Sequence, residues 1–226
     1  TPEEIAQSVG FWDSVRGAYS LDPNIVNLNN GGVSPQAIVV QEAVIQSYIM
    51  ANKLPSYNLW RKINIKRDTV RERLATMAGC KPTEIAINRN ATEGLETIIF
   101  GLPLKSGDEI ILGTYDYPAM IHAWEQRARR DNLKLIFVDI DVPSHSEEEI
   151  VDRYMSAISP DTRLVHLTHL INWTGQQIPV GKIGKLVQEK GIEVLVDGAH
   201  SFAHFDFRID ELHCDYFATS LRKWLG

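Results

Sequence analysis

Two residues in this sequence have the chemistry to hold a small molecule. Lys223 follows the apolar run 215–220 in the segment TSLRK, and Asp197 ends the strongly apolar run 192–198. A lysine amine can bond covalently to a carbonyl carbon. A carboxylate at the end of an apolar strand is desolvated and needs a cation or strong donors. Taken singly, Lys223 is more simply explained as a solvated charge, and a helix cap or a buried salt bridge explains Asp197 as well as a binding role does.

A third segment, NRNATEG, has the spacing of a helix N-terminus. Asn90 and Glu93 form an Asn-x-x-Glu capping pattern. The free amides of such a terminus, with the hydroxyl of Thr92, would bind a phosphate. Many capped helices bind nothing, so this motif is weak alone.

Polar residues of three further segments extend this set. Tyr117 in TYDYPAM could lie flat against a ring or simply pack, and His169 and Asn172 in THLINWTGQ follow another apolar run. His200 in DGAHS has His204 four residues later, a spacing that on a helix could bind metal. No third ligand is evident, so we expect no metal site.

The elements that would position these residues alternate along the chain. Apolar, β-rich runs are separated by amphipathic segments, the pattern of a parallel sheet with helices on both faces. Ligands of such sheets bind beyond the carboxyl ends of the strands. We therefore predict an α/β, three-layer αβα domain with a mainly parallel sheet and an N-terminal helical segment. The expected strands are 84–88, 108–113, 133–140, 162–170, 192–198 and 215–220, and the expected helices are 2–19, 35–52, 58–78, 117–130, 146–158 and 180–190.

Composition excludes several classes of protein. A net charge of −6 argues against nucleic acid as a partner, and no run is long enough for a membrane span. Cys80 and Cys214 form no C-x-x-C pattern, which favours a cytoplasmic setting, although a removed leader is compatible with the missing initiator Met. No G-x-G-x-x-G follows a strand, and GQQIPVGK has one residue too many for a P-loop, so NAD and ATP are disfavoured as ligands.

A phosphate seat, a buried acid, a ring-stacking residue and a strand-end lysine together suit pyridoxal 5′-phosphate (PLP). The segments LNNGGVSP, NATEG, DYPAM, THLINWTG, VDGAH and TSLRKWLG, in this order, resemble the class V aminotransferase family of PLP enzymes of fold type I. Within that family the chain looks most like the isopenicillin N epimerase branch, beside cysteine desulfurases. The resemblance implies an amino-acid substrate and a homodimer.

The resemblance also implies roles for named residues. Lys223 would form the Schiff base and move the proton on the substrate's α-carbon, and Asp197 would pair with the ring nitrogen. The remaining expected cofactor residues are Ala91, Thr92 and Ser220 at the phosphate, Tyr117 on the ring, and Asn172 and His200 at its phenolic oxygen. The expected substrate residues are Asn30, Gly31 and His169.

Two departures from the family pattern qualify this interpretation. The family usually has Ser-x-His-Lys where this sequence has Ser220-Leu221-Arg222-Lys223; Arg222 could still bind phosphate. Relatives also continue into a C-terminal small domain. We therefore expect an N-terminal arm at 1–30 and a PLP-binding large domain at 31–226, cut from a longer protein. Aminotransferase, epimerase and lyase chemistry stay open, as do cysteine desulfurase activity, a non-catalytic binding domain and an ordinary nucleotide-binding domain.

Overall fold

The computed structural model describes residues 1–144 and 146–225 and contains two compact units. The first comprises Thr1–Arg73 with the residues from Arg222 onward, and the second comprises Leu74–Leu221. Each is described by itself. The expected boundary at residue 30 stays a prediction, and Gly226, the last residue of the expected domain, lies outside the described residues.

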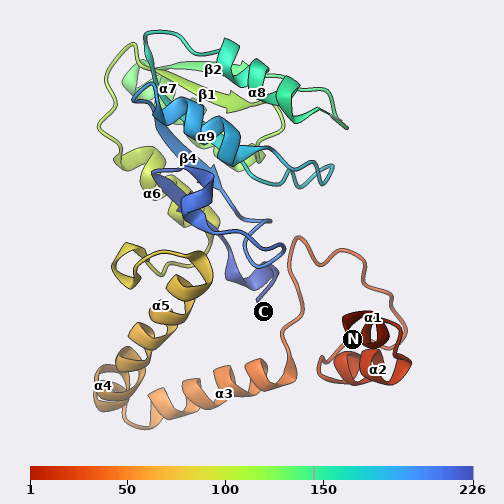
Figure 1. Ribbon diagram of the computed structural model, residues 1–226. Helices are drawn as coiled ribbons and strands as arrows, with labels where there is room; N and C mark the ends of the chain where they lie inside the picture. Colours follow the sequence, from red (N-terminus) through yellow and green to blue (C-terminus); the bar gives the residue numbers. More distant parts are fainter. Residues whose placement is uncertain (145, 226) are drawn as a thin grey trace. The chain divides into compact units, whose positions relative to one another are not determined.

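The first unit is helical (Figure 1). Its elements are α1 (Pro2–Ala6), α2 (Val9–Gly17), α3 (Ile38–Lys53), α4 (Pro55–Asn58), a π-helical turn (Leu59–Ile63) and the start of α5 (Asn64–Ala78). The single helix expected over 2–19 is wrong, because Ser8 accepts the N–H of Phe11 and caps a second helix there. None of the large apolar side chains in residues 1–73 is buried.

The second unit confirms the predicted α/β three-layer fold. Its sheet has the order β2-β1-β3-β4-β5, and every neighbouring pair is parallel (Figure 1). The strands are β1 (Glu109–Gly113), β2 (Lys134–Val138), β3 (Thr162–Thr168), β4 (Glu193–Asp197) and β5 (Tyr216–Ala218). The helices are α6 (Ala91–Gly101), α7 (Pro118–Asp131), α8 (Glu147–Ser156) and α9 (Val180–Gln188), with 3-10 turns at Pro82–Glu84 and Ile209–Leu212. A further 3-10 turn, Leu221–Lys223, starts at the last residue of this unit, and its other two residues belong to the first unit.

Alternate residues of the strands face two separate cores. Ile110 of β1 packs with Trp124 of α7 in the core that α6 and α7 cover. Its neighbour Ile111 packs with Ile150 of α8 and Ile183 of α9 in the other core. This two-fold alternation with both faces covered explains the unbroken apolar runs in the sequence.

The expected strand over 84–88 is not formed. Residues 82–84 make a 3-10 turn, and residues 85–88 pair with no described strand. Ile87 is 43% exposed, so the run lacks the burial on both faces that the other strands have. A five-residue segment with three consecutive apolar residues is too short to distinguish a strand from a half-covered loop.

Helix α9 lies unusually close to the 3-10 turn Ile209–Leu212. A Cβ added at Gly181 would stand 2.6 Å from the carbonyl oxygen of Glu211, and one added at Gly184 would stand 2.6 Å from that of His213. Both neighbours are backbone atoms, which cannot move away as a flexible side chain could. The two glycines therefore set the distance between helix and turn.

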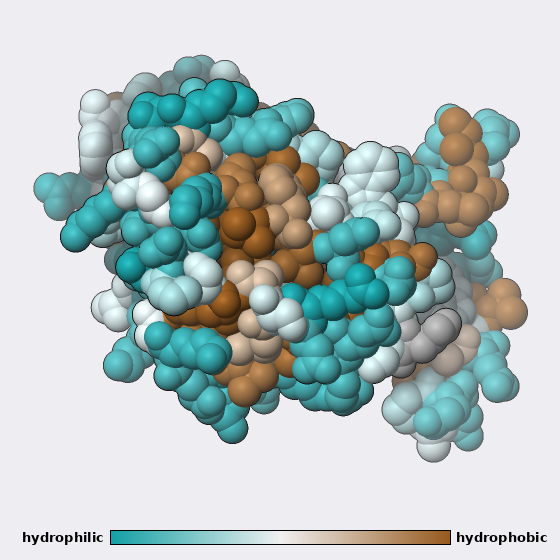
Figure 2. Space-filling model, turned by 90° about the horizontal axis from the view of Figure 1, so that it is seen from above, coloured by the Kyte–Doolittle hydropathy of each residue, from teal (hydrophilic) through white to brown (hydrophobic). Residues whose placement is uncertain are grey.

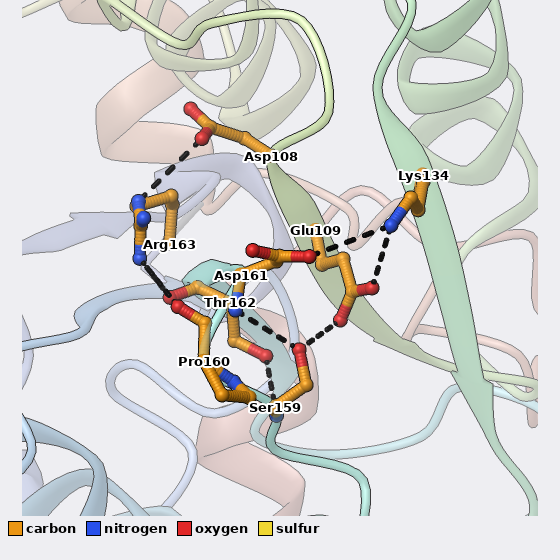
Figure 3. Close-up of polar contacts among 8 residues, drawn as sticks. All are labelled: Asp108, Glu109, Lys134, Ser159, Pro160, Asp161, Thr162 and Arg163. Atoms are coloured by element: carbon orange, nitrogen blue, oxygen red, sulfur yellow. Dashed lines mark hydrogen bonds and ion pairs between the residues drawn. The ribbon is translucent and has the colours of Figure 1, made fainter.

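Ion pairs join the amino ends of β1, β2 and β3 (Figure 3). Glu109 at the start of β1 accepts from Lys134 of β2 at 3.3 Å and from the hydroxyl of Ser159. Lys134 also lies 3.5 Å from Asp161, and Arg163 of β3 lies 3.5 Å from Asp108. The hydrogen bond from Ser159, followed by Lys134, lowers the pKa of Glu109. These contacts join the three strands at the edge opposite their carboxyl ends.

Apolar side chains also reach the surface. Phe137 is 43% exposed on the edge strand β2, and Figure 2 shows apolar residues exposed among hydrophilic ones. No helix within the described ranges is both long and apolar enough to cross a bilayer.

Candidate functional site

The carboxyl ends of the strands in the second unit form one edge. Chain order reverses between β1 and β3, because β2 lies on one side of β1 and β3 on the other. Ligands of open parallel sheets bind outside this edge, at such a switch point. The loops that leave β1, β3, β4 and β5 there carry Asp116, His169, His200 and Ser220.

The N-terminus of α6 lies against the loop after β5. Asn90 caps the helix by accepting the N–H of Glu93 at 2.9 Å, as predicted. The reciprocal bond of a capping box is absent from this contact, since the Glu93 carboxylate accepts from Arg89 instead. The Ser220 hydroxyl accepts the Ala91 N–H at 2.8 Å. The structure thus brings Ala91, Thr92 and Ser220 together, with the Ala91 amide already engaged by Ser220.

Asp197 ends β4 between two other strands. It lies in register with Thr168 of β3 and Ala218 of β5, and it is 5% exposed. One oxygen of the Asp197 carboxylate accepts the N–H of Ala199 at 2.9 Å. The backbone carbonyl of Asp197 accepts the N–H of His169 at 3.0 Å. The carboxyl group is therefore held at the edge by a turn in its own backbone.

His169 is a buried, neutral imidazole. Its ring meets the rings of Phe205 and Phe207 edge-on at 5.2 and 4.9 Å between centroids. Burial lowers its pKa to about 4. Among the described residues, Nδ1 of His169 has no hydrogen-bond partner. Buried polar atoms normally have partners, so this nitrogen points to a polar ligand or water at this edge.

The other predicted residues of this unit lie nearer the surface. Tyr117 precedes the first residue of α7 and is 45% exposed. Asn172 is exposed in the turn after β3, and His200 is half-buried in the turn after β4. His204 meets the carbonyl of His200 through Nδ1 at 3.1 Å. No group of three or more potential metal ligands occurs in the part of the chain that the structure describes.

Lys223, Arg222, Asn30 and Gly31 belong to the first unit. Lys223 and Asn30 line one cavity of about 560 Å³, together with Tyr19 of the N-terminal segment. The Arg222 guanidinium donates to the carbonyl of Gly32 at 3.4 Å, and the Arg222 carbonyl accepts the Ser34 hydroxyl at 2.9 Å. Arg222 is thus bound to the loop that contains Gly31.

Sequence reasoning gave no role to Asp116. Its side chain is 4% exposed, although it lies in a polar loop. Gly113, three residues earlier, donates its N–H to the Asp116 carboxylate at 2.9 Å. Nothing in the polar segment TYDYPAM indicates this burial.

The side chains of the second unit fit PLP in their chemistry. A phosphate suits the capped N-terminus of α6 with the Ser220 hydroxyl, and a cationic ring nitrogen suits a buried carboxylate. The Nδ1 of His169, which has no hydrogen-bond partner among the described residues, is compatible with a polar ligand beside it.

Comparison with known proteins agrees with this fit. The class V aminotransferase family matches residues 26–226. Isopenicillin N epimerase of Streptomyces clavuligerus is 30% identical over 220 residues, which cover 96% of this chain and 55% of the epimerase. A probable cysteine desulfurase of Synechocystis sp. is 27% identical over 206 residues, covering 88% of this chain and 48% of that protein.

A solved structure shares the fold as well. C-DES with glycine covalently linked to its PLP cofactor has a TM-score of 0.85 and 26% identity, covering 93% of this chain and 56% of that chain. The chain spans about half the length of these relatives. With a matched profile over 201 residues, from 26 to 226, and the same parallel sheet, the chain belongs to the class V aminotransferase family.

Proposed function

We propose that this chain is the cofactor-binding part of a PLP-dependent enzyme that acts on an amino acid. The observation that carries the proposal is the buried Asp197 carboxyl group at the carboxyl edge of the sheet. At the same edge, the Ala91 N–H at the N-terminus of α6 donates to the Ser220 hydroxyl. Membership of the class V aminotransferase family supports it. PLP, when bound, supplies an electron sink for the pair left on the substrate's α-carbon.

The residues of the chain would have two kinds of role, to hold the cofactor and to transfer protons. Asp197 would keep a proton on the ring nitrogen by pairing with it. Lys223 would hold the cofactor through its aldehyde carbon and then move a proton at the substrate's α-carbon. Thr92 and Ser220 would bind the phosphate, and Ala91 would contribute by fixing the Ser220 hydroxyl. Arg222 would act on the loop at Gly32, to which its guanidinium donates.

The remaining predicted residues would border the ring and the substrate. Tyr117 would cover one face of the ring, and Asn172 and His200 would donate to its phenolic oxygen. Neutral His169, with Nδ1 unpartnered among the described residues, would accept or donate one hydrogen bond at the substrate. Asn30 lines the same cavity as Lys223, and we assign it with Gly31 to the substrate side.

The reaction would be one of those carried out by the named relatives, epimerisation or sulfur-amino-acid cleavage, or a transamination. All three begin by breaking a bond to the α-carbon, and the choice depends on which bond is aligned with the ring. About half of each relative lies outside the matched region, and the corresponding part of this protein would help to determine which bond is broken.

We also propose that the protein forms a homodimer. Val39 and Tyr48 of α3 are 72% and 77% exposed, and Trp60 is 69% exposed. Large exposed apolar side chains on one helical unit are compatible with a contact surface. Sedimentation equilibrium should give twice the monomer mass; a monomer at micromolar concentration would contradict this part of the proposal.

The test of the proposed function is covalent labelling. The purified protein is incubated with PLP, reduced with borohydride and digested, and the peptides are mapped by mass spectrometry. We expect a pyridoxyl adduct on Lys223 and a visible absorption band near ~420 nm that is lost in Lys223→Ala, because only this amine would be bonded to the aldehyde carbon. The exposed Lys190 gives a matched control, since Lys190→Ala should keep both signals.

The alternative is a relative that keeps the fold without catalysis. The exchange of the family's usual histidine for Arg222, whose guanidinium is bound to Gly32, favours it. A colourless protein that takes up no PLP would favour that alternative, and labelling on another lysine would defeat the assignment of Lys223.

A further inference from the structure

Asp116 is a buried carboxyl group at the switch-point edge that the proposed function leaves without a role. It lies in the loop between β1 and α7 and accepts the N–H of Gly113 at 2.9 Å. A Cβ added at Gly113 would lie 3.2 Å from the Asp116 carboxylate and 2.8 Å from the hydroxyl of Tyr154. The glycine therefore lets the carboxyl group of Asp116 and the phenol of Tyr154 approach the same point above β1.

Asp116 and Asp197 follow strands that flank β3. The Thr168 end of β3 lies in register with Asp197 on one side, and Thr168 acts on the Asp116 carboxyl on the other. None of the ion pairs among the described residues includes Asp116. Two carboxyl groups thus share a buried edge.

The surroundings of Asp116 and Asp197 disfavour ionisation of both carboxyl groups at once. Burial raises the pKa of Asp116 to about 7, opposed by Thr168 and the Gly113 N–H, while the charge of Asp197 raises it further. Tyr154 of α8 is the other titratable group acting here, and burial, then Asp116, raises its pKa well above the usual value. Neighbouring carboxyl groups in one site normally keep a proton between them.

We propose that Asp116 is a positioning residue that carries the proton of this carboxyl pair and so leaves Asp197 as the anion facing a cationic ring nitrogen. This role rests on the proposed function, because the ring nitrogen belongs to PLP. A neutral Asp116 keeps its bond to Gly113 without adding a second negative charge to this edge. Asp197 then carries the charge alone.

The pair itself can be tested in the protein without cofactor. The side-chain carboxyl carbons of aspartate are labelled with ¹³C, and the Asp116 signal is identified by its loss in Asp116→Asn. We expect this signal to titrate near neutral pH, and we expect Asp197→Asn to lower its midpoint, because the charge of Asp197 is one of the causes that raise the pKa of Asp116. Asp139→Asn, at the end of β2 and exposed, is the matched control and should leave the midpoint unchanged.

The same titration with PLP bound tests the role. A cation beside Asp197 should lower the Asp116 midpoint in the same direction as Asp197→Asn, since both cancel the neighbouring charge. An Asp116 signal that titrates near pH 4, or that ignores Asp197→Asn, overturns the pair. Uptake of PLP on Lys223 without a shift of Asp116 overturns the positioning role alone. If the pair is coupled but no PLP is taken up, the proposed function fails and the positioning role fails with it.

Discussion

Arg127 is a buried arginine that joins the end of α6 to α7. It is 3% exposed, and its guanidinium donates to the carbonyls of Ile99 and Leu102, the latter at 2.6 Å. Its Nε donates to Asp131 at 2.8 Å. Because α6 begins at the candidate phosphate-binding site, these bonds at its other end help to fix the position of that site.

We predict that Arg127→Met lowers the free energy of unfolding by about 3 kcal/mol. Two charge-assisted hydrogen bonds to carbonyls contribute about 1.5 to 3 kcal/mol each. Methionine fills most of the space of the arginine stem, and the variant no longer has to desolvate a cation, which places the expected loss at the lower end of this range. For a chain of this length about 3 kcal/mol corresponds to a fall in Tm of roughly 6 to 12 °C.

The assay is urea unfolding followed by circular dichroism, with Arg130→Met as the matched control. Arg130 binds the same Asp131, at 2.7 Å, but its side chain is 56% exposed. An exposed ion pair contributes little, so the control should unfold close to the wild type. Equal losses in the two variants would show that the pairing with Asp131, rather than the two buried carbonyl contacts, is what matters, and would refute the reasoning.

Three further predictions concern the rest of the second unit. Gly184→Ala should destabilise the protein by about 1 to 3 kcal/mol because the new methyl group meets backbone carbonyls, whereas Gly101→Ala, with open space around it, should be neutral or slightly stabilising in the same urea assay. Burial lowers the pKa of His166 to about 3, so the unfolded chain binds a proton first and stability falls as the pH drops from 6.5 toward 3. His166→Gln should remove about 3 kcal/mol of the loss between pH 6.5 and pH 4, and an unchanged pH dependence would contradict this. Ser159→Ala should raise the pKa of Glu109 toward its usual value, measured by carboxyl NMR, since the hydroxyl of Ser159 is the main cause of its lowering.

Local patterns predicted the features that depend on a few neighbouring residues. The cap at Asn90 was predictable, because an N-cap and the third helical residue are close in sequence. The strand Glu109–Gly113 was predictable because its apolar residues are continuous and both faces are covered. The run at 84–88 has a similar composition but is only partly buried. Composition alone does not predict which other segments will pack against a run.

The site depends on contacts that no short segment contains. The bond between Ala91 and Ser220 joins residues 129 positions apart. In the sequence Asp116 is an ordinary loop residue. Its burial follows from its contacts with Gly113 and Thr168, which only the fold brings about. Ser8 shows the same limit at shorter range, since its capping bond competes with continuation of one amphipathic helix.

The two edges of the sheet differ in how their charged groups are paired, and this difference supports the proposed site at the carboxyl edge. At the amino edge, Glu109 and Lys134 satisfy each other near solvent, an arrangement that needs no ligand. At the carboxyl edge, the buried Asp116 takes part in no ion pair among the described residues, and the Nδ1 of His169 has no hydrogen-bond partner there. Leaving such groups buried costs folding free energy. A ligand that brings a cation and polar atoms to this edge would recover part of that cost on binding, so the burial of these groups favours the ligand-bound state.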